Sequence, residues 1–243
     1  MSELKRYDMI QACIDVIKKR KSKANYLEIG VQTGYCFFKI KADNKLAVDP
    51  DFIIKLKNKI KAYIKNLSNF NNEYFELTSD DFFAQKADHI KKTGGLDVVF
   101  IDGLHLYEQV AKDIENALKY LNKGGVILVH DCNPLNENAA VRAYTSAEVI
   151  AMNLPGYDYI WNGDVWKAIV ELRTTRKDVD VMVINTDHGV GLIRPVNTQT
   201  GLELTETQLT SLNYTDLDKN RETYLNLKNP EYFSTFINEF GKA

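Results

Sequence analysis

The sequence predicts an α/β fold with a doubly wound, mostly parallel sheet of seven strands that ends in an antiparallel hairpin. Short, continuously apolar segments alternate with amphipathic helical patterns, which is typical of parallel strands buried on both faces. The last two strand patterns are separated only by the turn-like residues 185–189. Strands joined so closely pair antiparallel. The 243 residues, 44% of them hydrophobic, are enough to bury the core of one large domain.

The elements follow one another in a regular order along the chain. An amphipathic helix is expected over residues 5–20, before the first strand. Strands are expected at 24–29, 46–48, 74–78, 97–101, 126–129, 179–184 and 190–193. Helices are expected at 35–41, from 51 to about 66, and at 82–92, 106–121, 136–153 and 163–170. We expect Gly124 and Gly125 to end the helix before the fifth strand, and Asp164 to cap the last of these helices.

The chain shows no internal repeat and no linker that would divide it. We expect a helix packed on the domain over residues 1–23, the main domain over 24–195 and a helical extension over 196–243. The aromatic residues of this extension suit either packing on the domain or contact with a second copy in a homodimer.

The charge balance excludes some partners. With a net charge of −2 and a pI near 6.1, the chain has no global attraction to nucleic acid or to an anionic membrane. The lysines between Lys55 and Lys65 have helical spacing, which we interpret as a solvated helix face. Three widely spaced cysteines form no zinc pattern, and their odd number favours a reducing compartment. No signal peptide or membrane span is evident, so a cytoplasmic location is expected.

The segment 96–134 holds the residues that point most directly to a reaction. The strand 97–101 ends in Asp102, and the strand 126–129 ends in His130 and Asp131. In open α/β sheets, ligands bind at the carboxyl ends of the strands. We therefore expect Asp102, His105, His130 and Asp131 to lie close together at one edge of the sheet.

A second group of residues suggests a nucleoside site. Glu28 begins the segment EIGVQTG, which ends at Gly34 and stands between a strand and a helical pattern. Glycines allow the backbone to approach a ligand closely, and a helix N-terminus offers free N–H groups. Asp49 ends the next strand, where a carboxylate can accept hydrogen bonds from both hydroxyls of a ribose. Turn glycines and an ordinary capping acid are the structural alternatives.

The segment EIGVQTG resembles motif I of S-adenosylmethionine-dependent methyltransferases, which is an acidic residue, any residue, then Gly-x-Gly-x-Gly. Gly30 and Gly34 match, whereas Gln32 stands at the middle glycine. The resemblance implies that Glu28 faces the methionine end of the cofactor. It further implies that Asp80 or Asp81 contacts the adenine amino group, and it adds Asp102 to the cofactor-binding residues.

The central segment resembles the family known as methyltransferase domain 24, near the macrolide-sugar O-methyltransferases and the cephalosporin-hydroxylase-like proteins. The family pattern is I-D-G-x-H-x-Y-x-x-V, followed by an aspartate, a helix, a pair of glycines and a strand that ends in H-D or D-D. Residues 101–110 read IDGLHLYEQV and are followed by Asp113, Gly124-Gly125 and His130-Asp131. The resemblance spans residues 24–195 and implies a Rossmann-like methyltransferase fold.

By this resemblance we expect methyl transfer from S-adenosylmethionine to an oxygen of a small hydroxylated acceptor, such as a sugar or a glycosylated metabolite. The protein must then align the acceptor and assist its deprotonation. One route uses Mg²⁺ held by Asp102 and Asp131. The other uses a histidine as general base, with His105 as the first candidate and His130 as the second. The alternatives are that His105 orients Asp102, and that His130 is a metal ligand or a buried structural residue.

Other functions fit the sequence less well. An NAD-dependent oxidoreductase would require a GxGxxG turn, which this sequence lacks. A nucleic-acid methyltransferase is disfavoured by the acidic pI and by the lack of an Asn/Asp-Pro-Pro-Tyr/Phe motif. A non-catalytic homologue that still binds the cofactor remains an alternative. Asp187 is interpreted as a turn residue, and Trp161 and Trp166 either line the acceptor pocket or bury a helix on the sheet.

Overall fold

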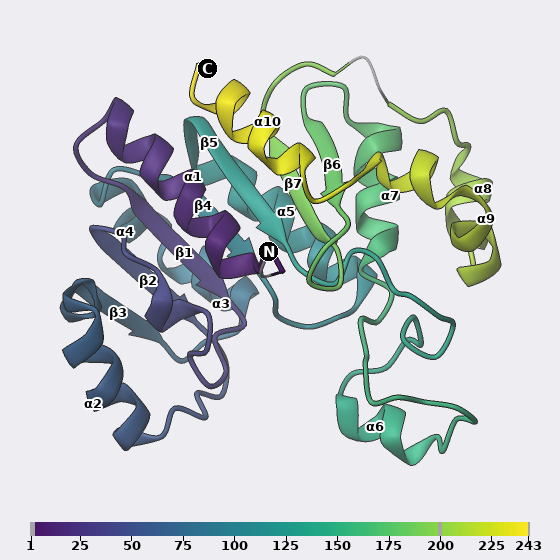
Figure 1. Ribbon diagram of the computed structural model, residues 1–243, viewed down its shortest axis with the longest axis horizontal. Helices are drawn as coiled ribbons and strands as arrows, with labels where there is room; N and C mark the ends of the chain where they lie inside the picture. The colour runs from purple at the N-terminus through teal and green to yellow at the C-terminus, as the bar shows by residue number, and fades with distance from the viewer. Residues whose placement is uncertain (1–2, 199–200, 243) are drawn as a thin grey trace.

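The protein was analysed as a computed structural model, which describes residues 3–198 and 201–242. The other residues, 1–2, 199–200 and 243, belong to the predicted terminal segments 1–23 and 196–243 and lie outside the described residues. A single sheet of eight strands has the order β3-β2-β1-β4-β5-β7-β6-β8 (Figure 1). Its strands are β1 Asn25–Ile29, β2 Asn44–Val48, β3 Asn72–Phe75, β4 Leu96–Ile101, β5 Leu121–Val129, β6 Asp180–Ile184, β7 Val190–Arg194 and β8 Leu227–Lys228.

The sheet confirms the predicted α/β class, with one strand more than expected. Strands β1 to β5 pair in parallel, and β7 lies antiparallel between β5 and β6. The extra strand, β8, belongs to the C-terminal extension and pairs in parallel with β6. It is two residues long, too short to give any period-2 pattern in the sequence.

The register of the strands explains how the site forms. Ile29 pairs with both Val48 and Ile101, and Ile101 pairs with Val129. These four residues are the last of their strands, so the next residue of each chain segment emerges at the same edge. The next residues are Gly30, Asp49, Asp102 and His130.

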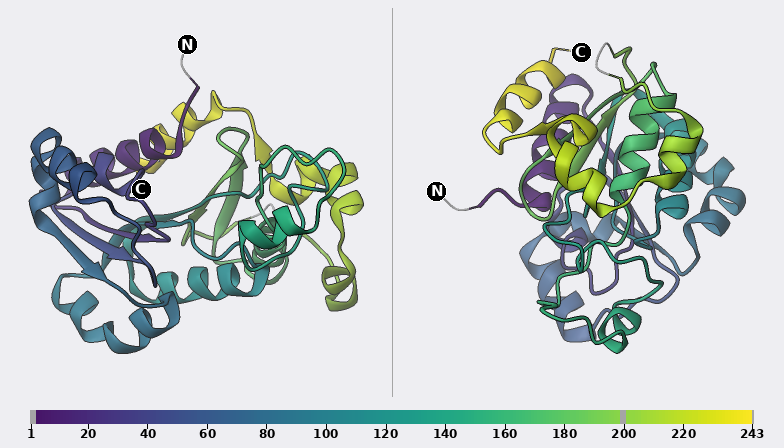
Figure 2. Two further views of the ribbon diagram at one scale, coloured as in Figure 1. Left: turned by 90° about the horizontal axis from the view of Figure 1, so that it is seen from below. Right: turned by 90° about the vertical axis from the view of Figure 1, so that its right-hand side faces the viewer.

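Two helical layers cover the sheet (Figures 1 and 2). On one face, α1 Arg6–Arg20 and α10 Tyr232–Phe240 share an apolar core with the 3₁₀ turn η1 Phe37–Lys39. On the other face, the core contains residues of α3 Ser79–Gln85, α4 Ala87–Lys92, α5 Tyr107–Tyr120, α7 Trp166–Thr175 and α9 Tyr214–Leu225. The remaining helical segments are α2 Leu56–Lys65, η2 Leu67–Asn71, α6 Ser146–Ala151 and α8 Glu206–Ser211.

Two predicted helices are wrong in extent. The helix expected over 35–41 is only η1, because the chain leaves it at Ile40 in an extended conformation and reaches β2 four residues later. The helix expected over 136–153 is only α6. Earlier in that segment, the carbonyl of Ala139 accepts from the backbone N–H groups of Asn162 and Gly163 and so takes no part in a helical ladder.

Smaller boundary corrections concern α3, α5 and α7. The helix expected over 82–92 starts at Ser79 and is divided into α3 and α4. Helix α5 ends at Tyr120, and the two glycines that were expected to stop it lie inside β5. Asp164 does not cap α7. Its Oδ1 accepts from the backbone N of Tyr107 at 2.7 Å, so it caps the first turn of α5 instead.

Candidate active site

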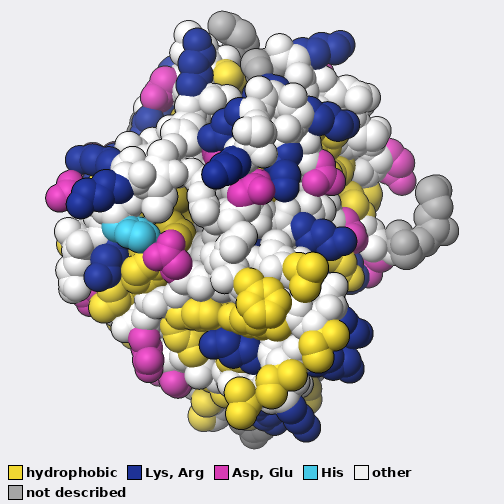
Figure 3. Space-filling view, turned by 90° about the vertical axis from the view of Figure 1, so that its left-hand side faces the viewer, with side chains coloured by type: hydrophobic (Ala, Val, Ile, Leu, Met, Phe, Trp, Pro, Cys, Tyr) yellow, Lys and Arg dark blue, Asp and Glu magenta, His cyan; other side chains and the backbone are white. Residues whose placement is uncertain are grey.

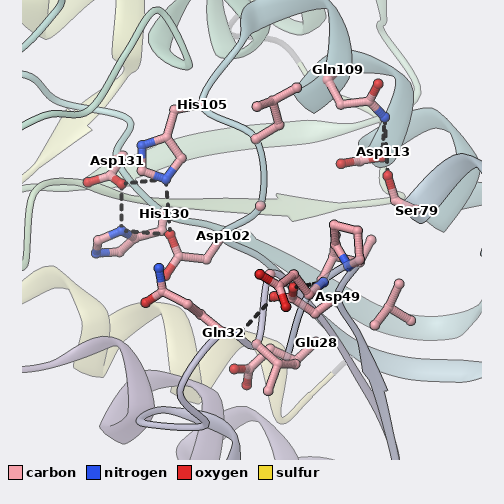
Figure 4. A pocket seen from close by; sticks show the side chains of 18 of the residues that line it. Glu28, Gln32, Asp49, Ser79, Asp102, His105, Gln109, Asp113, His130 and Asp131 are labelled. Atoms are coloured by element: carbon pink, nitrogen blue, oxygen red, sulfur yellow. Dashed lines mark hydrogen bonds and ion pairs between the residues drawn. The ribbon is translucent and has the colours of Figure 1, made fainter. Parts of the chain in front are cut away.

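A cavity of about 920 Å³ opens at the carboxyl edge of the sheet (Figure 4). Its lining includes residues that follow β1, β2, β4 and β5. It also includes the segments 144–146 and 159–161, which belong to the long connection between β5 and α7. The cavity therefore lies where the sequence placed both the nucleoside site and the polar cluster.

The structure brings Asp102, His105, His130 and Asp131 together, as predicted. His130 Nδ1 is 3.0 Å from Asp131 Oδ2 and 3.3 Å from Asp102 Oδ1. His105 Nε2 is 3.4 Å from Asp131 Oδ2 and 3.7 Å from Asp102 Oδ1. One oxygen of each carboxylate thus alternates with one nitrogen of each imidazole around a common centre (Figure 4).

The other oxygen of each carboxylate is held by a side chain that the sequence analysis did not identify. Arg6 Nη1 donates to Asp102 Oδ2 at 2.7 Å, and Asn162 Nδ2 donates to Asp131 Oδ1. These contacts direct Asp102 Oδ1 and Asp131 Oδ2 toward the histidines. Asp131 also has φ +60°, a conformation that costs energy for a residue with a side chain. The surroundings therefore fix Asp131 in a strained position.

Arg6 joins the cluster to the turn before β7. Its backbone N and its Nε both donate to Asp187 Oδ2 at 2.9 Å. Asp187 does occupy the turn with φ +47°, as the turn interpretation expects, and it is buried as well. No pattern in the sequence distinguishes Arg6 from the other basic residues of α1, because its role depends on the packing of α1 over the sheet.

The electrostatics of the cluster favour bound positive charge. Burial acts to lower the pKa of His130, but the carboxylates of Asp102 and Asp131 outweigh burial and raise that pKa to about 10. The pKa of His105 is also raised, because Asp102 and Asp131 outweigh its burial. Burial acts to raise the pKa of Asp102, yet His130, His105 and Arg6 hold it well below its usual range.

The donor set fits a divalent cation. For metal–ligand bonds of about 2.0–2.2 Å, neighbouring ligand atoms are about 2.8–3.6 Å apart. The four separations around the centre, 3.0 to 3.7 Å, are close to this range. The inner atoms of Asp102, His105 and Asp131 also lie within 4.8 Å of one another. Asp102, Asp131 and Asp187 carry three negative charges against the two positive charges of Arg6 and Lys5, so the cluster is net negative when its imidazoles are neutral.

The predicted nucleoside end of the cavity is built on Gly30 and Asp49. Gly30 has φ +85°, and a Cβ there would lie 2.0 Å from the carbonyl oxygen of Asp102, so only glycine fits. Asp49 Oδ2 accepts from the backbone N of Gln32 at 2.7 Å. Gln32, at the place of the middle glycine, has φ +48° and extends toward the Asp102 side of the cavity (Figure 4).

Glu28 and Gly34 differ in their relation to the cavity. Glu28 lines it and is almost fully buried, and Tyr26 Oη donates to its carboxylate. Burial raises the pKa of Glu28 to about 8. Gly34 is not among the residues that line the cavity. It makes the turn with φ +78°, and a Cβ there would collide with the ring of Phe38.

Of the two acids proposed for the adenine amino group, only Asp80 lines the cavity. Asp81 accepts from Thr78 Oγ1 at the start of α3 instead. Next to Asp80, Gln109 Nε2 donates to Ser79 Oγ at 3.1 Å and to Asp113 Oδ1 at 2.9 Å. The sequence pattern assigns no role to Gln109 or Asp113. Their i, i+4 spacing on α5 would have placed them on one face of the helix.

The two tryptophans have different roles. The ring of Trp161 lines the cavity and lies 4.8 Å from the ring of His105, whereas Trp166 is buried in the core. Gly163, with φ +65°, contacts the backbone of His105 so closely that a Cβ would lie 2.0 Å from its carbonyl oxygen. The segment 161–164 therefore positions His105.

Comparison with known proteins gives a family match over part of the domain. Residues 27–132 match the family described as "Methyltransferase domain". An uncharacterized protein of Acanthamoeba polyphaga mimivirus is 29% identical in an alignment of 129 residues that covers 46% of this chain and 52% of the viral protein. The chain thus spans about half the length of this curated relative.

Two solved structures are similar at low sequence identity. An O-methyltransferase from Bacillus cereus in complex with SAH is 15% identical, with a TM-score of 0.49 over 79% of this chain and 82% of that chain. The O-methyltransferase TomG from Streptomyces achromogenes, in complex with SAM, is 15% identical, with a TM-score of 0.48 over 77% and 79%. The family match begins inside β1 and continues past the end of β5 to Cys132, so it includes both groups of predicted site residues.

Proposed function

We propose that this chain, of which residues 27–132 match the methyltransferase domain, is a class I S-adenosylmethionine-dependent methyltransferase and methylates an oxygen of a small hydroxylated acceptor. A sugar or a glycosylated metabolite is the kind of acceptor we expect. The observation that carries the proposal is the cluster of Asp102, His105, His130 and Asp131 at the same cavity edge as Gly30 and Asp49. A methyl donor at Gly30 and an acceptor at the cluster would meet in one cavity.

The cofactor end of the cavity rests on the residues at the tips of β1 and β2. We assign the ribose to Asp49, whose two oxygens keep lone pairs free beyond the two backbone bonds that hold them. We assign the methionine end to Glu28 and Gly30, and the adenine amino group to Asp80. Asp102 serves both ends, because its backbone lies against Gly30 while its carboxylate belongs to the cluster.

His105 is the proposed general base. Methyl transfer from a sulfonium is an in-line displacement, so the protein has to align the acceptor oxygen and accept its proton. His105 is the more exposed of the two clustered histidines, with 19% of its side chain accessible against 3% for His130. Asp102 and Asp131 face its Nε2 and would stabilise the imidazolium formed when it takes the proton.

As the alternative to a histidine base, we assign Asp102, His105 and Asp131 as the residues that would hold a divalent cation. Such an ion, when bound, would lower the pKa of the acceptor hydroxyl. His130 Nδ1 already lies 3.1 Å from Arg6 Nη1, so His105 Nε2, which faces both carboxylate oxygens, suits the ligand role better. A nitrogen ligand favours a transition metal such as Mn²⁺ over Mg²⁺. Arg6 and Asn162 would keep the two carboxylates oriented.

The acceptor would enter beside the aromatic rim of the cavity. Tyr144, Tyr159 and Trp161 line it, and the first two are 65% and 77% exposed. Flat aromatic faces accommodate the apolar surface of a ring-shaped acceptor, while the cluster contacts its hydroxyl.

The test begins with calorimetric titration of the purified protein with S-adenosylhomocysteine, with NAD as the control ligand. We expect micromolar binding of the first and none of the second. Transfer of a labelled methyl group to a panel of sugars and glycosylated compounds then measures activity. Absence of S-adenosylhomocysteine binding would overturn the proposal, and binding without transfer to any acceptor would favour a non-catalytic homologue.

The role of His105 is tested with a matched variant. His105→Ala should lower turnover at least about a hundredfold, within the usual range for a lost general base, while affinity for S-adenosylhomocysteine stays within a few-fold. His89→Ala is the control, because His89 lies at the surface beside Glu73 and outside the cavity. Normal turnover in His105→Ala would rule out this assignment.

A further inference from the structure

Helix α2 exposes an apolar strip instead of burying it. No residue of α2 is buried, and Leu56, Ile60 and Ile64 are 72%, 54% and 76% exposed. Their i, i+4, i+8 spacing places them in one line along the helix. Leu67 and Phe70 in the following 3₁₀ turn are 73% and 68% exposed and extend the strip.

The helix is attached to the domain by a neighbouring, more polar face. Lys59 Nζ lies 4.3 Å from the ring centroid of Tyr74, and Tyr63 Oη is 3.3 Å from Tyr74 Oη. Asn66 Nδ2 donates to the carbonyls of Phe38 and Ile40. Because these contacts fix the orientation of α2, the isoleucines face outward as part of the folded structure.

Lysines accompany the apolar strip, and its own segment of the chain contains no acidic residue. Residues 52–72 contain five lysines and no aspartate or glutamate. Lys55, Lys57, Lys61 and Lys65 are exposed, whereas Lys59 faces the domain. We call the exposed residues of this segment the α2 surface: Leu56, Ile60, Ile64, Leu67, Phe70, Lys55, Lys57, Lys61 and Lys65. Figure 3 shows hydrophobic side chains gathered beside lysines on the side of the molecule that carries α2.

We propose that the α2 surface docks this protein on an anionic lipid membrane. An apolar strip flanked by lysines on one helix is the pattern of a helix that lies in the membrane interface, with its apolar residues among the acyl chains and its lysines at anionic headgroups. The charge is complementary only to an anionic surface. The sequence alone predicts a solvated lysine face and no membrane contact, because it does not show which side of α2 faces the domain.

The shape of the α2 surface agrees with a membrane as the occupant. In Figures 1 and 2, α2 lies at the outer end of the molecule, beside the edge strand β3. It forms a projecting helix, and the interface of a lipid layer can accept such a helix without a matching groove. The segment before α2 includes Asp51 and Ile53, which line the cavity, so docking would bring the cavity close to the membrane.

This mode of association needs no spanning helix. Across residues 3–198 and 201–242, the structure holds no helix with the length and apolar character to cross a bilayer. Docking through α2 would be peripheral and reversible, and it does not depend on the proposed reaction.

The experiment is co-sedimentation of the full chain with phosphatidylcholine vesicles that contain or lack phosphatidylglycerol. We expect binding only to the anionic vesicles, and a decrease as salt is raised. Ile60→Ser/Ile64→Ser and Lys57→Glu/Lys61→Glu should each lower vesicle affinity at least about tenfold. Both pairs are exposed, so circular dichroism melting curves should match those of the wild type.

The control is Leu135→Ser/Val196→Ser, which removes two exposed apolar side chains outside the α2 surface and should bind vesicles normally. The proposal is overturned if the wild type does not bind anionic vesicles, or if the α2 variants bind as well as the control. Equal binding to neutral vesicles would also overturn it. A third contrary result would be a concentration-dependent dimer that does not bind vesicles and that Ile60→Ser/Ile64→Ser abolishes. The strip would then be an interface between two copies of the chain.

Discussion

Arg6 Nη1 lies 2.7 Å from Asp102 Oδ2, although 96 positions separate the two residues in the chain. The contact fixes the Asp102 carboxylate with its other oxygen directed at His105 and His130. It also links the first turn of α1 to the carboxyl edge of the sheet. The N-terminal helix is therefore part of the candidate active site, in addition to covering one face of the domain.

Arg6→Ala should lower methyl transfer about 10- to 100-fold, because partners that orient a functional carboxylate commonly contribute that much. Arg6→Lys should restore only part of the loss, since an ammonium cannot contact Asp102 and Asp187 in the same way. Lys19→Ala, at an exposed position of the same helix, is the control. Turnover of Arg6→Ala equal to that of Lys19→Ala would contradict an orienting role.

Removal of metal should abolish turnover if Asp102, His105 and Asp131 hold a cation. After dialysis against a chelator, we expect Mn²⁺ to restore activity at lower concentration than Mg²⁺ because of the nitrogen ligand. Electron paramagnetic resonance should detect one bound Mn²⁺ per chain, and Asp131→Asn should lose it. Full activity in the presence of chelator would show that no cation takes part. Deprotonation of the acceptor would then depend on the histidines alone.

Gly30→Ala should abolish binding of S-adenosylhomocysteine and lower the melting temperature. A Cβ at this position would lie 2.0 Å from the Asp102 carbonyl oxygen, so β1 and β4 would have to separate at the site. Gly156→Ala is the matched control, since Gly156 also has positive φ but a Cβ added there would meet no atom within 4 Å. That variant should cost only about 1–2 kcal/mol from backbone strain. Equal effects of the two substitutions would show that position 30 requires glycine because of its backbone conformation. The close approach of Asp102 would then not be the reason.

Glu28 should make stability fall as pH rises. Burial raises the pKa of Glu28 from 4.5 to about 8, so the folded state binds a proton more tightly than the unfolded state. The stabilising contribution is complete below pH 4.5 and is lost as pH rises toward 8. Glu28→Gln removes this titration, so its melting temperature should fall less than that of the wild type between about pH 5 and pH 8.5. Parallel melting curves for the two proteins across this range would show that Glu28 is ionised at neutral pH.

The sequence by itself determined the sheet and its functional edge. Continuous apolar runs such as 97–101 and 126–129 are buried on both faces, and the residue after each run must emerge at the carboxyl end of its strand. This local rule was sufficient to place Asp49, Asp102, His130 and Asp131 at one edge. The hairpin of β6 and β7 followed equally from the short turn between them.

Only the tertiary structure decided which further residues complete the site. Arg6, Asn162 and Asp187 complete the site because α1, the long connection between β5 and α7, and the turn between β6 and β7 pack together at the edge of the sheet. Such contacts between distant segments leave no periodic signal in a single sequence. The same holds for β8, which needs its partner β6 to form, and for α2. The sequence shows that α2 is amphipathic, but its orientation is set by the contacts of Lys59, Tyr63 and Asn66 with the rest of the domain.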